Sequence, residues 1–184
     1  NNCVGKGRES TYIVAAYNST NKAYADYVTD FSSDETEINQ AITSAYASGR
    51  GGKVYLLEGD YKLSTGSGDK IVMATSTSLI GAGNSTVIHI ASSTNASANA
   101  IAAYSTPYIT IADLYVDGNK GNNSGSQVGI FLNAVSTSSI RNVLVSSSTF
   151  YGVHLLNSSW VTVEGSAVNN NDFNGIRLST SINN

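Results

Sequence analysis

The chain has little charge, one cysteine and no long apolar run. Only 12% of its 184 residues are charged and the net charge at pH 7 is -3, so it has no basic field to attract nucleic acid or an anionic lipid surface. No apolar run reaches the roughly 18 residues of a membrane-spanning helix. The single cysteine, Cys3, cannot form an internal disulfide. It is either a free thiol or a link to another chain.

Small polar residues take the place of the missing charge. Ser, Thr, Asn and Gly are abundant, while apolar residues still make up 41% of the chain. That is enough for one domain with a continuous core. The composition is typical of a solenoid, in which turns outnumber helices.

One pattern is repeated three times in the last third of the chain. It occurs at 129–132 (Gly-Ile-Phe-Leu), 152–155 (Gly-Val-His-Leu) and 175–178 (Gly-Ile-Arg-Leu), at one constant interval that indicates a repeat architecture. The apolar residues between these segments alternate in short bursts separated by polar turns, which is strand spacing. Each period therefore predicts three short strands, forming one coil of a parallel β-helix. The same register predicts that Val145 stacks on Val168 and Phe150 on Phe173.

The register continues towards the N-terminus with longer coils. The interval from Ile101 to Ile130 is longer than the later ones, with all the extra length in one loop at 117–128, and Ile71 precedes Ile101 by a similar interval. The sequence thus predicts an all-β parallel β-helix of five to six coils. Residues 53–184 form the coils, the last of them incomplete, and residues 1–52 form an N-terminal cap in the same domain.

The cap is predicted to contain short strands at 12–16 and 25–28 and one α-helix. Asp34 and Glu37 have capping-box spacing at the start of this helix. Five apolar residues follow on one predicted stripe: Ile38, Ala41, Ile42, Ala45 and Tyr46. We expect the stripe to cover the open end of the first coil.

Three segments resemble the pectate lyase-like right-handed parallel β-helix superfamily. Residues 51–63, with Gly-Gly, Val-x-Leu, a glycine turn and Tyr-x-Leu, are similar to its opening coil. Residues 79–88 resemble the next coil, and residues 114–119 a later one. The chain departs from the usual pattern in having Leu57 and Glu58 where proline is common. The resemblance, which covers residues 12–184, implies a right-handed β-helix; it does not imply one activity, because the fold occurs in lyases, hydrolases, tailspikes, adhesins and inert surface proteins.

Superfamily members that cleave acidic polysaccharides resemble one another in having clustered carboxylates on one sheet. This sequence lacks the cluster, since Asp113 is predicted to align with Asn142 and Gly165 in the following coils. An acid-base pair of carboxylates is therefore not expected.

The glycine-led strands instead present an aromatic and basic strip. If Ile130 and Val153 point inwards, alternation places Phe131, His154 and Arg177 outwards in one column, after Ala102, with Tyr104 in the next. The predicted ligand-binding residues are Tyr104, Phe131, His154 and Arg177. They either stack on sugar rings and bind an acidic sugar, or pack on a neighbouring subunit. His154 and Arg177 are also the catalytic candidates.

No cofactor is expected, unless calcium binds the loop that contains Asp117 and Asn119. The alternating oxygen ligands and glycines of 117–122 suggest this ion, but the loop lacks a closing glutamate and is equally explained by turn chemistry. His89 is interpreted as an exposed residue on the solvent face of its strand.

Five sequons and an N-terminal residue other than Met favour an extracellular, cell-surface or virion-surface protein. The candidate glycosylation sites are Asn18, Asn84, Asn95, Asn122 and Asn157.

Assembly is predicted from the last coil. It offers Ile176 and Leu178 to the core without a following strand to cover them. Either the chain is a fragment of a longer β-helix, or another copy adds its N-terminal strand by head-to-tail β-augmentation. The residues assigned to this contact are Tyr12, Ile13, Val14, Ile176 and Leu178, with Cys3 reinforcing it.

These observations support two classes of function. The leading hypothesis is a non-catalytic structural module that assembles into a surface layer, sheath, fibre or appendage. The alternative is a carbohydrate-active protein: a polysaccharide lyase or hydrolase, a virus tailspike, or a glycan-binding adhesin.

Overall fold

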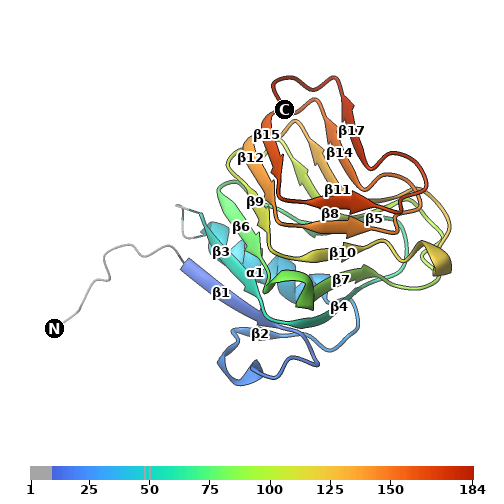
Figure 1. Cartoon of the computed structure of the whole chain (residues 1–184). Helices are drawn as coiled ribbons and strands as arrows, with labels where there is room; N and C mark the ends of the chain where they lie inside the picture. The colour runs from blue at the N-terminus through green and yellow to red at the C-terminus, as the bar shows by residue number, and fades with distance from the viewer. Residues whose placement is uncertain (1–9, 48, 50) are drawn as a thin grey trace.

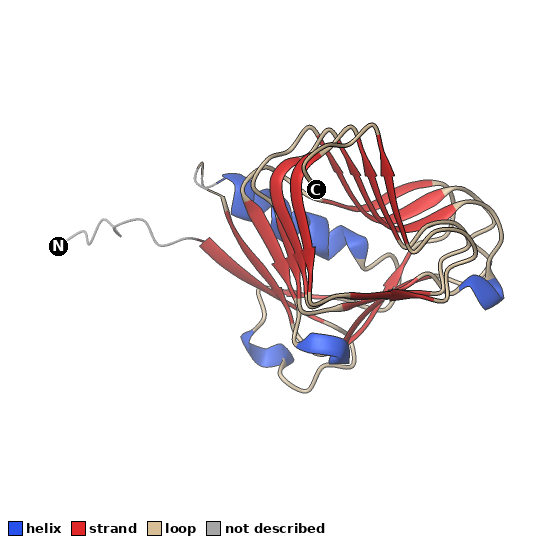
Figure 2. Ribbon diagram, turned by 45° about the horizontal axis from the view of Figure 1, so that its top comes forward, coloured by secondary structure: helices blue, strands red, loops and turns tan. Residues whose placement is uncertain are grey.

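The computed structural model describes residues 10–47, 49 and 51–184. Its strands form three parallel sheets, A, B and C, that enclose one core like the faces of a prism (Figures 1 and 2). Each full coil contributes one strand to each sheet, and sheets B and C have five strands each. The fold is therefore the predicted all-β parallel β-helix, with about five turns. No helix in these residues is long and apolar enough to cross a membrane.

The strands of each sheet are given below in spatial order, so that neighbours in a list are hydrogen-bonded to each other. Sheet A contains β15 (Ser159–Glu164), β12 (Ser136–Arg141), β9 (Thr110–Ala112), β6 (Thr77–Ile80), β3 (Gly52–Leu56), β1 (Ser10–Ala15) and β2 (Tyr27–Val28). Sheet B contains β16 (Ala167–Asn169), β13 (Leu144–Ser146), β10 (Tyr115–Asp117), β7 (Thr86–Ile90) and β4 (Gly59–Leu63). Sheet C contains β17 (Ile176–Ser179), β14 (Val153–Leu156), β11 (Gln127–Asn133), β8 (Ala98–Tyr104) and β5 (Gly68–Val72). The helices are α1 (Glu35–Ala47) and three short 3-10 helices, η1 (Lys22–Tyr24), η2 (Gly83–Ser85) and η3 (Lys120–Asn122).

The register predicted from the repeats is confirmed along the chain. Val145 pairs with Val168, and the rings of Phe150 and Phe173 lie 4.8 Å apart between centroids. The longer coils keep their register too, since Ile101 pairs with both Ile130 and Ile71. Equivalent residues of successive coils therefore stack directly on one another.

The core is a set of such stacks of aliphatic side chains. In sheet C, Ile71, Ile101, Ile130 and Val153 occupy matching positions, and all four are fully buried. Burying a side chain of this size contributes about 1.5–3 kcal/mol. The stacks therefore stabilise the coils along the whole length of the prism.

Helix α1 packs against β1, β3 and β5 and covers one end of the coils (Figure 1). Ile38, Ala41, Ile42 and Ala45 of the predicted stripe are buried, but Tyr46 is 54% exposed. Its inclusion in the stripe was wrong, because the helical rotation of about 100° per residue turns Tyr46 about 80° away from Ile38.

The predicted capping box is also not formed. The backbone N–H of Asp34 donates to the carbonyl of Lys62, 3.1 Å away, rather than to Glu37. The Asp34 carboxylate accepts from the backbone N–H groups of Lys62 and Ser32, at 2.8 and 3.1 Å. Asp34 thus ties the start of α1 to sheet B, a role that the local spacing could not reveal.

His89 is half-buried rather than exposed. The ring of Phe31, in the loop before α1, lies 5.6 Å from the imidazole in an edge-to-face contact. The interpretation of His89 as a solvent-facing residue was wrong because this loop folds over the outer face of sheet B. Burial lowers the pKa of His89 below its usual range.

Candidate functional site

The outer face of sheet C carries the aromatic and basic residues predicted from the sequence. Strand pairing places Phe131 beside His154, and His154 beside Arg177. Tyr104 lies in the neighbouring column, opposite Asn133. The four residues Tyr104, Phe131, His154 and Arg177 are called the sheet C strip below. Ala102, predicted to begin the same column, is fully buried, so the accessible strip begins at Tyr104 and Phe131.

The rings of the strip contact one another in sequence across the strands. The centroids of Tyr104 and Phe131 are 5.7 Å apart in an edge-to-face arrangement, and those of Phe131 and His154 are 5.2 Å apart. Tyr104 is 40% exposed and Phe131 partly exposed. Sugar rings present C–H faces that pack well on aromatic surfaces of this kind.

Tyr151 completes this arrangement and was missed in the sequence. Its ring lies 5.0 Å from the imidazole of His154, edge to face, and the guanidinium carbon of Arg177 lies 5.2 Å from its centroid. Tyr151 precedes Gly152 and lies just outside β14, where the alternation rule does not apply. The cation–π contact holds the Arg177 head over the strip.

Ser179 links the two polar residues of the strip. Its hydroxyl oxygen accepts a hydrogen bond from Nε of Arg177 at 3.0 Å and lies 3.2 Å from Nε2 of His154. Burial, and then the charge of Arg177, lower the pKa of His154 below its usual range. The Ser179 hydroxyl therefore bridges the Arg177 guanidinium and Nε2 of His154.

An acidic residue lies at the other end of the strip. The carboxylate of Asp69 accepts a hydrogen bond from the Asn99 side chain at 2.6 Å. Burial, and then the neighbouring Asp69, raise the pKa of the Tyr104 hydroxyl to about 12. The strip therefore has an acidic end on the early coils and a basic end at Arg177.

This arrangement suits recognition of an anionic sugar better than hydrolysis. Arg177 can pair with a carboxylate, and the rings can support the sugar faces. His154 could accept a proton, but its Nε2 lies 3.2 Å from the Ser179 hydroxyl oxygen. No group of three or more metal-ligating side chains occurs in the part of the chain that the structure describes, and the predicted alignment of Asp113 with Asn142 is seen in a side-chain hydrogen bond of 3.0 Å.

The loop considered for calcium is organised as a turn. The Asp117 carboxylate accepts from the backbone N–H of Asn119 at 2.9 Å, and Asn119 has a left-handed backbone with φ of 54°. The Asn119 side chain in turn donates to the carbonyl of Ile90 at 2.9 Å. The first contact is that of an Asx turn, and the second ties this turn to the preceding coil; calcium binding here remains a prediction.

All five sequon asparagines are exposed. Three have their side-chain nitrogens engaged: Asn18 donates to Asp60 at 2.9 Å, Asn122 to Asn119 at 2.7 Å and Asn157 to Asn133 at 3.5 Å. Glycosylation at any of these positions would replace the bond. Use of the sequons, and the surface location that they favour, remain predictions.

The structure changes the assembly hypothesis. Strand β1 is not free to join another chain, because it lies between β3 and β2 in sheet A and its Val14 is fully buried. Assigning Tyr12, Ile13 and Val14 to an intermolecular strand was therefore wrong. Ile176 and Leu178, at the other end, are 46% and 54% exposed. Cys3 lies outside the described residues.

Comparisons with known proteins find a similar architecture in solved structures of two epimerase modules. No protein-family model matches the chain, and no curated protein matches it in sequence. Among solved structures, it is similar to the A-module of the mannuronan C-5 epimerase AlgE4 from Azotobacter vinelandii. The TM-score is 0.70 at 27% identity, over 80% of this chain and 44% of that one. The AlgE6 A-module of the same organism gives a TM-score of 0.65 at 23% identity, over 77% of this chain and 44% of that one.

These similarities define the class of the protein as a parallel β-helix of the pectate lyase-like type, structurally similar to polysaccharide-modifying modules. The chain spans less than half the length of either module. The carbohydrate-active alternative is thereby favoured over the purely structural hypothesis.

Proposed function

We propose that the protein binds an acidic polysaccharide along the sheet C strip. The observation that carries this proposal is the contact between Arg177, Tyr151 and His154, which places a guanidinium beside a row of aromatic rings that become more exposed from His154 towards Tyr104. A uronic acid residue combines a carboxylate with an apolar ring face. Arg177 would pair with the carboxylate, while Phe131 and Tyr104 would pack on the neighbouring sugar faces.

The structural comparison supports a uronate as the sugar. The AlgE4 module is named as an epimerase of mannuronan, a polymer built of uronic acids. Strip residues lie on neighbouring strands of sheet C, at a rise of about 4.8 Å per strand. An extended chain crossing the strands would therefore meet Phe131, His154 and Arg177 in succession.

We expect binding without cleavage. A glycosidase needs two carboxyl groups on either side of the scissile bond, and the strip supplies Asp69 only at its far end. Epimerisation or elimination would require a base free to remove the proton beside the uronate carboxylate. The candidates in the strip are His154, whose Nε2 is engaged by the Ser179 hydroxyl, and Arg177, whose guanidinium stays protonated and contacts Tyr151 and Ser179.

The test is calorimetric titration with mannuronan oligomers at two salt concentrations. Arg177→Gln should weaken binding about tenfold, the equivalent of one charge-assisted hydrogen bond. Arg141→Gln is the matched control, since Arg141 is an exposed arginine on sheet A and its replacement should leave affinity unchanged.

Several results would contradict the proposal. Equal weakening by the two variants would show that binding depends only on net charge. Failure of the wild-type chain to bind mannuronan oligomers would refute the proposed site. Release of unsaturated products or new reducing ends, abolished by His154→Gln, would show that the strip is catalytic.

A further inference from the structure

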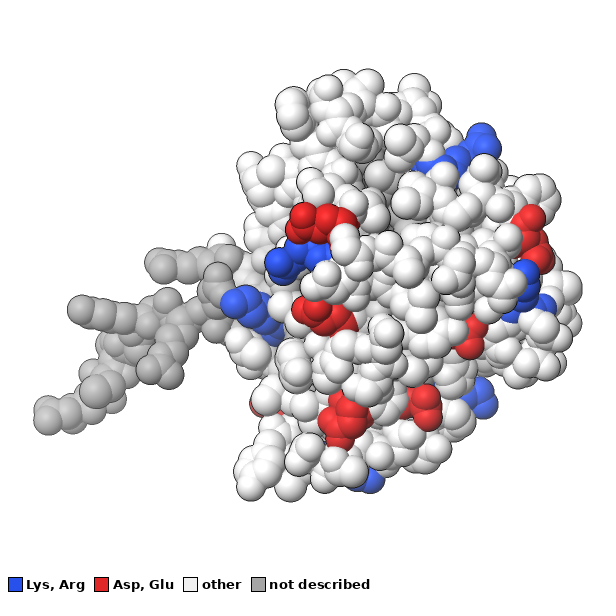
Figure 3. Space-filling model, viewed as in Figure 1, with Lys and Arg blue, Asp and Glu red and all other residues white. Residues whose placement is uncertain are grey.

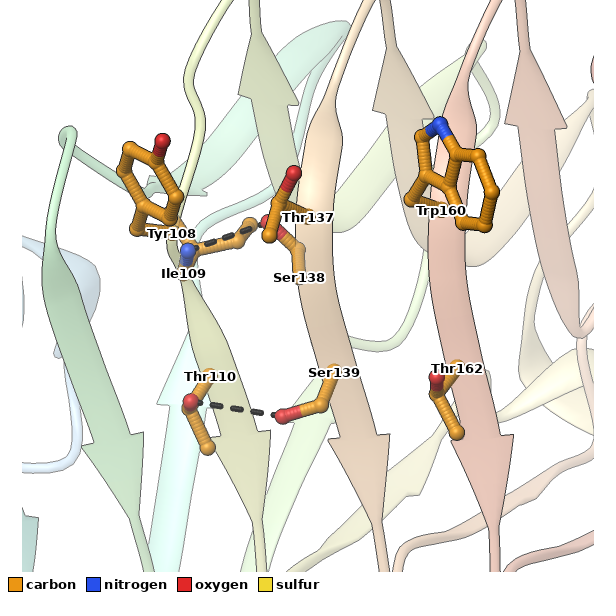
Figure 4. A pocket seen from close by; sticks show the side chains of 8 residues that line it. All are labelled: Tyr108, Ile109, Thr110, Thr137, Ser138, Ser139, Trp160 and Thr162. Atoms are coloured by element: carbon orange, nitrogen blue, oxygen red, sulfur yellow. Dashed lines mark hydrogen bonds between the residues drawn. The ribbon is translucent and has the colours of Figure 1, made fainter. Parts of the chain in front are cut away.

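A groove on the outer face of sheet A is separate from the sheet C strip. Its volume is about 400 Å³. Figure 4 shows that its side chains form two rows across β9, β12 and β15: Tyr108, Thr137 and Trp160 in one row, and Thr110, Ser139 and Thr162 in the other. The first row places two large aromatic side chains on either side of a small one.

The strand register fixes the spacing of these rows. Thr110 pairs with Ser139, and Ser139 with Thr162, so Tyr108, Thr137 and Trp160 stand at the same corner of three successive coils. Tyr108 and Trp160 are thus two strand steps apart, about 9.6 Å. Because Thr137 is small, the space between the rings remains open.

The two aromatic residues are unusual occupants of this corner. Tyr108, Thr137 and Trp160 have left-handed backbones, with φ of 60°, 49° and 57°, a conformation that bulky side chains rarely adopt. The preceding left-handed position in the same connections between sheets C and A holds only small or polar residues: Ser105, Ala134, Asn157 and Thr180. A strained tryptophan at such a position is a reason to look for a function.

Both rings are available for binding. Tyr108 is 62% exposed and Trp160, the only tryptophan in the chain, is 63% exposed. Among the described residues, neither ring contacts another aromatic ring, and neither the Tyr108 hydroxyl nor the Trp160 N–H has a protein hydrogen-bond partner. Most of the surface of each ring is therefore open to a ligand.

The second row offers hydroxyl groups and no charge. Oγ1 of Thr110 and Oγ of Ser139 lie 3.3 Å apart, and Thr162 follows on β15. Ser138 is not available, since its hydroxyl accepts from the backbone N–H of Ile109 at 3.0 Å. The groove therefore combines two apolar platforms with a line of neutral hydrogen-bonding groups.

We infer that this groove binds a neutral, extended polysaccharide that is distinct from the anionic ligand of sheet C. Sugar residues two apart along such a chain would pack on Tyr108 and Trp160, and the intervening residue would pass over Thr137. Sugar hydroxyls would bond to Thr110, Ser139 and Thr162. Pyranose chains present C–H faces and hydroxyl edges together, which is the combination that the two rows provide, and the absence of charge excludes a salt-dependent contact.

Trp160 reports directly on the groove, because its fluorescence is the only tryptophan signal of the protein. The probes are cellohexaose and β-1,4-linked mannohexaose, with mannuronan hexamer as the charged comparison. At least one neutral hexaose should shift the emission to shorter wavelength and protect Trp160 from acrylamide, to the same extent at low and high salt. Tyr108→Ala should weaken this binding about tenfold, the loss of one apolar stacking contact.

Tyr24→Ala is the matched control, since Tyr24 is 83% exposed and lies outside the groove; it should bind like the wild type. Circular dichroism of Tyr108→Ala establishes that the variant is folded. Arg177→Gln should leave neutral-sugar binding unchanged. Failure of the sheet C proposal and failure of the groove proposal can therefore be distinguished.

Unchanged Trp160 emission with both neutral hexaoses at millimolar concentration would overturn the inference. A spectral shift that depends on protein concentration rather than on sugar would assign the groove to contact between copies instead. A shift produced only by the mannuronan hexamer and lost in Arg177→Gln would assign the effect to sheet C.

Discussion

His154 occupies the central position of the sheet C strip, between the Phe131 ring and the Arg177 column. Its pKa is lowered, first by burial and then by the charge of Arg177. A histidine whose folded pKa lies below its unfolded value, about 6.5, binds fewer protons when folded. The stability of the protein should therefore fall as the pH drops below that value, as the unfolded chain takes up protons.

The same histidine provides a titration test of the proposed site. A bound uronate would place carboxylates near His154 and favour its charged form, so mannuronan oligomers should raise its pKa. His89, whose pKa is also lowered by burial, lies on sheet B and should titrate unchanged. NMR titration of the two imidazoles measures both. A shift in His89 alone, or a further decrease for His154, would place the ligand elsewhere.

Tyr61 is the buried polar residue whose contacts are clearest. It is fully buried, and its hydroxyl lies 2.9 Å from the carbonyl oxygen of Val14 and 3.0 Å from that of Leu57. Burial raises the pKa of this hydroxyl. Tyr61→Phe should lower the free energy of unfolding by about 1 kcal/mol, because it removes the shared donor. Chemical denaturation measures the change, and Tyr24→Phe, at an exposed tyrosine, should have no effect; equal values for the two variants would refute this role.

At the scale of the elements, the sequence was most informative where side chains repeat. The regular intervals between apolar residues identified stacked pairs in sheets B and C, because a buried stack requires an apolar residue in every coil. The columns of the sheet C strip followed from the alternation of strand residues. Even Asp113 and Asn142, placed one above the other by the register, are hydrogen-bonded.

The features that the sequence did not reveal lie at corners or between distant segments. Tyr151, Tyr108 and Trp160 stand outside regular alternation, where backbone angles alone decide the direction of the side chain. Asp34 bonds to Lys62, and Phe31 covers His89; both contacts depend on how a loop folds onto a sheet. The pairing of β1 within its own chain was not predicted, because the sequence of a short apolar strand does not indicate which strand it pairs with.

Gly152 tests the role of the glycines that lead the strands of sheet C. A Cβ at this position would clash with Cγ1 of Val168 and lie 2.7 Å from the carbonyl oxygen of Gly175. Gly152→Ala should therefore destabilise the protein by about 1–3 kcal/mol through overpacking. Gly121→Ala is the control, since nothing lies within 4 Å of its Cβ position. Thermal unfolding should separate the two variants, and similar melting temperatures would show that the coils adjust freely.

At the scale of the whole molecule, the surface is largely uncharged. Figure 3 shows acidic and basic residues scattered over one face without a large patch of either sign. Large apolar side chains are exposed on and around the last coil: Phe173, Ile176, Leu178 and Ile182. Exposed apolar side chains of this size favour contact with other protein surface.

Association of two copies through this surface remains a prediction. Strand β2 is the edge strand of sheet A at the opposite end of the prism. In a head-to-tail contact, β2 rather than β1 would therefore face the neighbouring copy. Replacing both Ile176 and Leu178 by Ser should lower the apparent mass in light scattering at high concentration. The control replaces Val72 and Tyr108 by Ser, which removes exposed apolar groups from the sides of the prism. If the wild-type chain is monomeric at every concentration, or the control has the same effect, the contact does not exist.

The corner between β10 and β11 shows that coil length can vary without loss of register. The segment from Val116 to Ile130 is longer than that from Val145 to Val153, although Val116 pairs with Val145 and Ile130 with Val153. The additional length includes η3, where Gly121 and Asn122 are exposed. A peptide epitope grafted between these two residues should therefore be displayed from the side of the prism, while the hydrophobic stacks beneath it keep their alignment.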